Sequence, residues 1–369
     1  MDDATGWQDM TEISRRKSDH LRIVTEGRGA QDRLDSGFDQ VRFLHQALPD
    51  LDMDAVDTGT RFLGRSLGAP LLISAMTGGP EEAERINLHI AEACAHHRIA
   101  LSVGSQRIAV EAGGNGGLGA SLRARAPQIP ILGNIGAVQL NYGFGVAQAQ
   151  RAVDMIQADA LILHLNPLQE AIQEGGDRNF AALLPRIEEL ATSLPVPLGV
   201  KEVGAGLSAP VARRLIDAGV TILDVAGAGG TSWARVEAER GPDRLQALAA
   251  PFHDWGIPTT ASLRAIAPMM GPDRVLIGSG GVRHGLDAAR AIRLGADLVG
   301  QAARALPAAR HSAEALSDHL SDVVTQLRIA MFCTGSGDLA ALRRAPLLVP
   351  GPGGQWSQAT GMETGDAGL

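Results

Sequence analysis

The sequence is poor in cysteine and in aromatic residues. Its 369 residues include only 2 Cys, 7 Phe, 4 Trp and 1 Tyr. Cys94 and Cys333 are too few for a disulfide framework or a cysteine-rich metal motif, and their apolar helical contexts predict reduced core residues. With few aromatics, the core must consist mainly of Leu, Ile, Val and Ala, which suits strands packed between helices.

The sequence also lacks any apolar run long enough to span a bilayer and any signal-peptide pattern. It therefore predicts no membrane association and a cytoplasmic location. The net charge of −8 disfavours nucleic acid as a partner. The length allows one large α/β barrel or two ordinary domains.

Short apolar runs recur at regular intervals, and most intervals contain an amphipathic helix, such as those at 81–90 and 209–218. The runs lie at 70–75, 101–104, 130–135, 160–165, 197–202, 221–226, 275–279 and 296–300. Eight strands that alternate with helices predict a (β/α)8 TIM barrel. The alternative, a doubly wound sheet, would place a glycine fingerprint after its first strand, whereas here the densest glycine turns come late.

Two turns of small residues follow the last two predicted strands, at 278–281 and 300–303, with a helix expected over 286–294 between them. Glycine lets backbone N–H groups approach an anion, and a helix N-terminus adds partial positive charge. Arg283, just past the first turn, would donate two hydrogen bonds from its guanidinium to phosphate oxygens. Barrels of this type bind phosphate after strands seven and eight, so we expect a phosphate site here.

The predicted carboxyl ends of the other strands are polar and rich in amides, with one lysine at the mouth. A flat, electron-accepting ring would suit this set, with Asn134 and backbone groups at 75–77 at its edge. Lys201 would stabilise negative charge on a reduced ring. Together with the phosphate site, these features suggest flavin mononucleotide, FMN. A Schiff-base role for Lys201 is the alternative.

The remaining segments divide the chain. Residues 1–66 are expected to form an N-terminal arm and a cap over the barrel mouth, and residues 67–348 the barrel. Residues 349–369 are rich in Gly, Pro and Ser and are expected to be a disordered tail. The connection at 227–257, before a helix near 260–268, is unusually long, which is typical of functional or mobile loops.

Seven motifs, in order from about residue 15 to 345, resemble the type 2 isopentenyl diphosphate isomerases, and MFCTG at 331–335 resembles their C-terminal helix. The motifs are RKSDH at 16–20, AMTGG at 75–79, SVGSQR at 102–107, HLNPLQE at 164–170, VKEVG at 200–204, GAGGTSW at 227–233 and SGGVR at 279–283. The resemblance implies an FMN-binding barrel that assembles as a homo-oligomer of four or eight subunits. One departure is Ala226, where many members have serine; losing one hydrogen bond to the flavin would cost about 1 kcal/mol.

The resemblance also implies a role for individual residues. FMN would be held by Ala75, Met76, Thr77, Ser105, Asn134, Lys201, Thr231, Gly281, Val282, Arg283, Ala302 and Ala303. The substrate would meet Arg16, Lys17, His20, Ser105, Gln106, Arg107, Asn166 and Gln169. Glu170 would bind Mg²⁺, which neutralises the diphosphate together with the cations. The catalytic set would be Gln169, His164, Lys201 and Trp233.

The implied reaction converts isopentenyl diphosphate to dimethylallyl diphosphate by a 1,3-allylic proton shift in isoprenoid biosynthesis. Reduced FMN would stabilise the cationic intermediate, and we hypothesise that its N5 moves the protons. NADPH would serve only to reduce the flavin, because the isomerisation is redox-neutral. Gln169 is the nearest protein candidate for a proton relay, and Trp233 would exclude water.

Two other functions are compatible with the same barrel. An FMN-dependent oxidoreductase of a small hydroxy acid would need a histidine base beside an arginine clamp, and His284 next to Arg283 starts a helix instead. A flavin carrier without catalysis would not need the polar set around Glu170. Taken alone, Glu170 would be a helix-start carboxylate, His164 a satisfied strand-end histidine and residues 15–20 a charged helix start.

Overall fold

The computed structural model describes residues 17–31, 34–76, 81–112, 118–350 and 356–358. Eight parallel strands close into a barrel in the order β10-β3-β4-β5-β6-β7-β8-β9, which confirms the predicted (β/α)8 fold. The strands are β3 (Leu71–Ile73), β4 (Ala100–Ser102), β5 (Ile131–Gly136), β6 (Ala160–His164), β7 (Leu198–Lys201), β8 (Ile222–Asp224), β9 (Val275–Ser279) and β10 (Leu298–Gln301). Each lies within its predicted apolar run or extends one residue beyond it.

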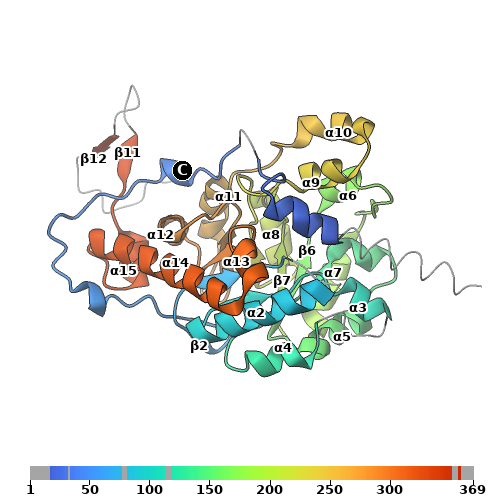
Figure 1. Ribbon diagram of the computed structural model, residues 1–369, viewed down its shortest axis with the longest axis horizontal. Helices are drawn as coiled ribbons and strands as arrows, with labels where there is room; N and C mark the ends of the chain where they lie inside the picture. Colours follow the sequence, from blue (N-terminus) through green and yellow to red (C-terminus); the bar gives the residue numbers. More distant parts are fainter. Residues whose placement is uncertain (1–16, 32–33, 77–80, 113–117, 351–355, 359–369) are drawn as a thin grey trace, which may run out of the picture.

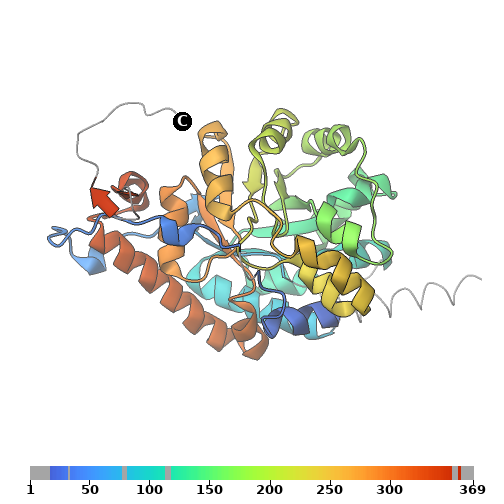
Figure 2. The same cartoon turned by 90° about the horizontal axis from the view of Figure 1, so that it is seen from above.

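Helices surround the barrel (Figures 1 and 2). They are α2 (Glu81–His97), α3 (Arg107–Ala112), α4 (Ala120–Arg125), α5 (Val146–Ile156), α6 (Pro167–Ile172), α7 (Leu183–Ser193), α8 (Ala209–Asp217), α9 (Trp233–Arg240), α10 (Asp243–Ala249), α11 (Thr259–Ile266), α12 (Gly285–Arg293), α13 (Leu306–His311), α14 (Ala313–Cys333) and α15 (Leu339–Arg344). Both cysteines are free, and Cys94 is buried. Within the described ranges, none of these helices has the length and apolar character needed to cross a membrane.

The barrel interior consists of two layers, because alternate side chains of a strand point to the same face. The apolar layer contains Leu72, Ala100, Leu132, Ala160, Ile162, Ile222, Ile277 and Leu298. Two positions further along each strand, toward its carboxyl end, lies what we call the polar layer. Its members are Ser74, Ser102, Asn134, His164, Lys201, Asp224, Ser279 and Gly300. The strand register therefore places every polar layer side chain at the same end of the barrel.

A hairpin of β1 (Thr60–Phe62) and β2 (Arg65–Leu67) closes the opposite, amino end. Phe62 and Leu67 pack against the apolar layer. Arg65 donates to Asp159, which precedes β6, with Nε–Oδ1 at 3.0 Å and Nη2–Oδ1 at 2.8 Å. The expected cap over the mouth is thus wrong for this hairpin, because the apolar layer at the amino end is what its two buried side chains cover.

Segments expected to be irregular are folded in two places. The long connection after β8 contains α9 and α10, and the Ser232 side chain caps α9 by accepting from the backbone N–H of Arg235 at 3.4 Å. Near the carboxyl terminus, β11 (Leu348–Pro350) pairs with β12 (Trp356–Gln358). The guanidinium of Arg42 lies 4.8 Å from the centre of the Trp356 ring. The expected disorder of 349–369 is therefore wrong for these two strands, and the rest of that tail is outside the described residues.

We expect the hairpin to contribute to stability but not to ligand binding. Phe62 is 3% exposed, and Phe62→Ala should lower the free energy of unfolding by about 3–5 kcal/mol through lost burial and a cavity. Leu48, 87% exposed, is the matched control, and Leu48→Ala should change it by less than about 0.5 kcal/mol. Urea unfolding measures both variants; equal stabilities would contradict this role of the hairpin.

Candidate active site at the carboxyl ends of the strands

A cavity of about 600 Å³ lies over the polar layer. Its volume falls in the range typical of ligand and cofactor sites. The site residues predicted from the sequence that line it are Lys17, His20, Ala75, Met76, Ser105, Arg107, Asn134, His164, Asn166, Gln169, Glu170, Lys201, Thr231, Trp233, Gly281, Val282, Arg283, Ala302 and Ala303. Arg16 and Thr77 lie outside the described residues. The fold therefore brings together side chains that are up to 286 positions apart, from Lys17 to Ala303.

Lys201 and Asp224 occupy paired positions on β7 and β8, and both line the cavity. Lys201 Nζ donates to the Glu202 carbonyl at 3.0 Å. Removal from water lowers the pKa of Lys201, and Asp224 opposes this by favouring the charged amine. Burial raises the pKa of Asp224, while Lys201 and a 2.6 Å hydrogen bond from Ser279 Oγ favour its carboxylate. Asp224 was not among the site residues predicted from the sequence; its register with Lys201 is the signal that would have found it.

His164 faces Asn134 across β5 and β6, with His164 Nδ1 and Asn134 Oδ1 2.9 Å apart. Asn134 Nδ2 donates to the Val103 carbonyl at 3.0 Å, which fixes Oδ1 as the acceptor toward the histidine. Burial, with smaller contributions from the charges of Lys201 and Lys17, lowers the pKa of His164 to about 3. His164 is therefore neutral near pH 7, with its proton on Nδ1 and the lone pair of Nε2 available as an acceptor.

Glu170 is a buried carboxylate at the start of α6. Its Oε1 accepts from Asn166 Nδ2 and its Oε2 from the backbone N–H of Asp177, both at 2.8 Å. Arg107 is nearby, held by Asp177 at 2.7 Å and by Glu111 at 3.0 Å. Across the described segments no group of three or more His, Cys, Asp or Glu side chains is placed to hold a metal. A cation at Glu170 would therefore need further oxygen ligands from a substrate and from water.

Helix α9 contributes a carboxylate that sequence reasoning missed. Glu237 is 1% exposed and contacts His20 Nε2 at 3.0 Å, Gln169 Nε2 at 2.8 Å and Arg240 Nη1 at 3.0 Å. Burial would raise the pKa of Glu237, but hydrogen bonds and charges from these neighbours outweigh it and lower the pKa to about 2. Glu237 thus fixes Gln169 and the helical segment 17–25, which lies beside α9 in Figures 1 and 2.

Trp233 begins α9 and lines the cavity where it was expected to exclude water. Its ring meets that of His20 edge to face, with centroids 5.1 Å apart. Residues 29–31 join the same region, since Ser232 N–H donates to the Gly29 carbonyl and Gln31 N–H to the Gly230 carbonyl. Residues 17–31 of the N-terminal segment therefore lie against α9 and line part of the cavity.

The turn after β9 has the form predicted for an anion cradle. Gly280 and Gly281 have φ of 101° and 66°, a region that favours glycine. A Cβ on Gly280 would lie 2.1 Å from the Gly227 carbonyl oxygen, so the turns after β8 and β9 touch. Only glycine allows this approach, which leaves backbone groups of the β9 turn lining the cavity.

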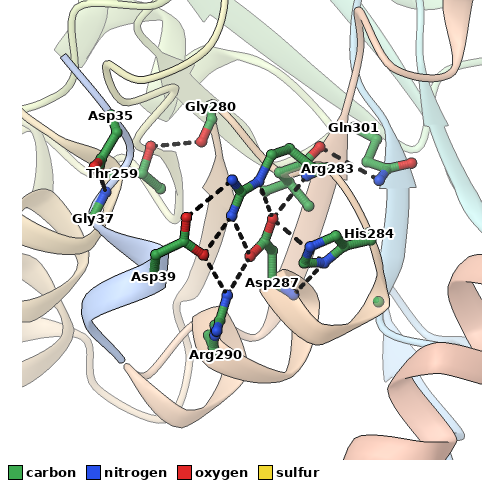
Figure 3. Close-up of polar contacts among 12 residues, drawn as sticks. Asp35, Gly37, Asp39, Thr259, Gly280, Arg283, His284, Asp287, Arg290 and Gln301 are labelled. Atoms are coloured by element: carbon green, nitrogen blue, oxygen red, sulfur yellow. Dashed lines mark hydrogen bonds and ion pairs between the residues drawn. The ribbon is translucent and has the colours of Figure 1, made fainter. Parts of the chain in front are cut away.

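Arg283 differs from its prediction (Figure 3). Its Nη2 lies 2.8 Å from Asp39 Oδ1 and its Nε 2.9 Å from Asp287 Oδ2. Arg290 joins the same two carboxylates, at 3.1 and 2.9 Å. The hydrogen bonds that Arg283 donates to Asp287 and Asp39 raise its pKa above the ordinary value. Because both carboxylates engage the guanidinium, the expected pair of hydrogen bonds to a phosphate is wrong for this arrangement. Backbone N–H groups of the turn and the side chain of Arg304, which also lines the cavity, can donate to an anion instead.

Gln106 also differs from its prediction. It is 0% exposed, and it is not among the described residues that line the cavity. Its Nε2 donates to the Ala152 carbonyl at 2.8 Å, and its Oε1 accepts from the backbone N–H of Asn134 at 2.9 Å. Both ends of the amide are bound to backbone, so Gln106 supports the strand that carries Asn134 instead of contacting a diphosphate.

The residues present fit FMN. The glycine turn can take a phosphate, Lys201 can face a ring that gains negative charge, and the cavity has the volume for a nucleotide. The buried hydroxyl of Ser74 and the carboxamide oxygen of Asn166 line the cavity without a hydrogen-bond partner. Unpaired buried polar atoms of this kind are expected where a polar ligand belongs.

Comparisons with known proteins also indicate a barrel that binds FMN. A family model described as FMN-dependent dehydrogenase matches residues 147–349. Solved structures with a similar fold include mandelate oxidase with (S)-2-phenylpropionate (TM-score 0.58, 16% identity, covering 92% of this chain and 97% of that chain). A lactate oxidase of Pediococcus acidilactici gives 0.59 at 16% identity, covering 92% and 93%. The fold and the site define an FMN-type (β/α)8 barrel.

Curated relatives narrow this class. A protein named isopentenyl-diphosphate delta-isomerase from Xanthobacter autotrophicus is 60% identical over 92% of this chain and 98% of its own length. Those of Stutzerimonas stutzeri, at 57% over 90% and 96%, and of a Synechococcus species, at 53% over 92% and 97%, carry the same name. The chain belongs to the FMN-dependent isopentenyl-diphosphate delta-isomerase family, as its motifs indicated.

The lowered pKa of His164 predicts a pH dependence. In the unfolded chain the His164 imidazole takes up a proton near pH 6.5, whereas in the folded ligand-free protein it stays neutral down to about pH 3. The contribution of neutral His164 to the free energy of unfolding is therefore fully present above pH 6.5. It is lost as the pH falls below 6.5, by up to about 1.4 kcal/mol per pH unit. In urea unfolding at pH 7, 6 and 5, His164→Asn should reduce the slope. The exposed His96→Asn is the control, and equal slopes for both variants would refute the assignment.

Proposed function

We propose that this chain converts isopentenyl diphosphate to dimethylallyl diphosphate with reduced FMN and Mg²⁺. The observation that carries the proposal is the meeting, in one cavity, of Lys201 in the polar layer with the buried carboxylate of Glu170. The first suits a ring that carries negative charge, and the second suits a cation bound to a diphosphate. The names of the relatives support the same reaction.

The diphosphate would lie between Glu170 and the cations at the mouth. Arg107 and Lys17 both line the cavity, and they would neutralise part of its roughly three negative charges. Mg²⁺ would take one carboxylate oxygen from Glu170 and complete its shell with diphosphate oxygens and water. Ser105 and Asn166 would add hydrogen bonds, and Arg16 would join them from outside the described residues.

The hydrocarbon end would then face the polar layer. When bound, reduced FMN would supply an electron-rich ring and a protonatable nitrogen beside the double bond. Gln169 is held by Glu237 at 2.8 Å and Asn166 at 3.2 Å, so its amide has one orientation toward the cavity. His164 offers the lone pair of a neutral imidazole. Trp233 and His20 would keep water away from the cationic intermediate.

The allylic shift moves no net electrons, so NADPH would be needed only to reduce the flavin. A hydroxy-acid oxidoreductase on the same barrel would instead need a histidine base at the cavity beside an arginine clamp. His284 caps α12 by accepting from the backbone N–H of Asp287 at 3.2 Å, and Arg283 is bound to carboxylates. Neither residue is available for that chemistry.

The proposal includes a cytoplasmic homo-oligomer of four or eight subunits that binds neither nucleic acid nor membrane. The net charge of −8 supports the absence of nucleic acid. The rings of Phe252 and Trp255, 36% and 60% exposed, lie edge to face with centroids 6.0 Å apart and form an apolar patch that a second subunit would cover. Analytical ultracentrifugation gives the subunit number, and a monomer would contradict this part.

An anaerobic assay tests the function. With isopentenyl diphosphate, Mg²⁺ and reduced FMN, the purified chain should form dimethylallyl diphosphate, and with oxidised FMN it should form none. Glu170→Gln should raise the Mg²⁺ concentration for half-maximal rate by about 10–100-fold, because a metal ligand is lost. The exposed Glu174→Gln, four residues further on, should behave as wild type. Full turnover with oxidised FMN, or an unchanged Mg²⁺ requirement in Glu170→Gln, would contradict the proposal.

A further inference from the structure

Gln139 lines the cavity but has no part in the site predicted from the sequence. It lies in the short helix η3 (Ala137–Asn141), which follows β5, and it is 3% exposed. Its carboxamide nitrogen Nε2 donates to Asp177 Oδ2 at 2.9 Å, whereas its carboxamide oxygen Oε1 is buried and has no hydrogen-bond partner. An unpaired buried oxygen costs free energy, so its presence needs an explanation.

Asp177 fixes the direction of this oxygen. Its carboxylate accepts from Gln139 Nε2 and, at 2.7 Å, from Arg107 Nη1. A reversed carboxamide would place oxygen against carboxylate, so Oε1 points away from Asp177. A Cβ on Gly136 would lie 3.4 Å from Gln139 Cγ and 3.2 Å from His164 Nε2, so the side chain passes a glycine beside the polar layer. Gln139 Oε1 is therefore a fixed acceptor at the cavity.

The same aspartate joins Gln139 to the carboxylate that would bind Mg²⁺. The backbone N–H of Asp177 donates to Glu170 Oε2 at 2.8 Å. At the other carboxylate oxygen of Glu170, Asn166 repeats the pattern, because its Nδ2 donates to Oε1 at 2.8 Å while its own Oδ1 is unpaired and lines the cavity. Two carboxamides whose oxygens lack a partner are therefore linked to Glu170, one directly and one through Asp177.

A carboxamide oxygen selects its partner by charge. It can accept a hydrogen bond or bind a cation, but it repels the oxygens of a diphosphate. Mg²⁺ demands octahedral oxygen coordination and keeps several water molecules. Across the part of the chain that the structure describes, no group of three or more His, Cys, Asp or Glu side chains could replace this water. Each bound water needs acceptors for its hydrogens, and Gln139 Oε1 is a buried acceptor that is still unused.

We propose that Gln139 is a further residue of the metal site, whose carboxamide oxygen accepts a hydrogen bond from a water molecule bound to Mg²⁺ at Glu170. The inference rests on the proposed function, because it requires the metal at Glu170. Gln139 contacts neither the flavin nor the diphosphate in this arrangement, so its loss should weaken metal binding and leave FMN binding unchanged. Groups that hold the ligands of a metal typically change its affinity by about 10–100-fold.

Binding of Mn²⁺, whose electron spin resonance signal falls when the ion is bound, measures metal affinity without turnover. The protein carries oxidised FMN and isopentenyl diphosphate, so no isomerisation is expected. Gln139→Met, which keeps the length of the side chain, should raise the Mn²⁺ dissociation constant about tenfold. Gln139→Glu keeps an acceptor oxygen whether or not it is protonated, and it should bind Mn²⁺ nearly as tightly as wild type. The exposed Gln128→Met is the matched control and should behave as wild type.

A double-mutant cycle separates a role at the metal from a role in folding. In the Glu170→Gln background, Gln139→Met should cost little further Mn²⁺ affinity, and all variants should bind FMN alike. Unchanged Mn²⁺ affinity in Gln139→Met would overturn the inference. So would an equal loss in the Glu170→Gln background, an equal loss in Gln139→Glu, or weaker FMN binding in Gln139→Met. If wild type binds no Mn²⁺, the proposed function fails as well, whereas wild-type binding with an unaffected Gln139→Met refutes the role of Gln139 alone.

Discussion

The charge pairing of Lys201 with Asp224 is the constraint on which the site depends. The register of β7 and β8 places the two side by side at the inner face of the barrel, and each opposes the shift that burial alone would impose on the other. An isolated buried charge would be neutralised or excluded, and the carboxylates of Asp224 and Glu202 both favour the charged amine of Lys201 at the cavity floor. The neutral state of His164 follows in part from the same cation.

The two ends of the barrel have separate tasks. At the amino end, the β1–β2 hairpin covers the apolar layer, and stability depends on that burial. At the carboxyl end, the polar layer stays open to the cavity, and its cover consists of the segment 17–31 and α9, joined through Glu237. Further ion pairs join Arg28 to Glu239 and Arg240 to Asp19, and Leu21 and Ile23 of the segment are buried, so both charge pairs and apolar contacts anchor this cover.

Apolar runs that alternate with helices made the eight strands predictable, and glycine placement indicated the turn after β9. Most of the cavity residues were implied by the resemblance of the motifs to the isomerase family and not by periodicity. The sequence does not show which end of the barrel the hairpin at 60–67 covers, because a local pattern carries no information on long-range packing. Asp39 pairs with Arg283 across 244 positions, and Glu237 meets His20 from a helix that looked like a loop. Such partners are set by the closed barrel and not by neighbouring residues.

The midpoint potential of bound FMN tests the central claim, that Lys201 favours the electron-rich, anionic form of the reduced ring. A positive charge beside the ring stabilises the reduced anion, so the potential should be higher in wild type than in Lys201→Met, where Asp224 would remain unpaired and act in the same direction. Lys201→Arg should keep most of the wild-type value. An unchanged or higher potential in Lys201→Met would contradict the account.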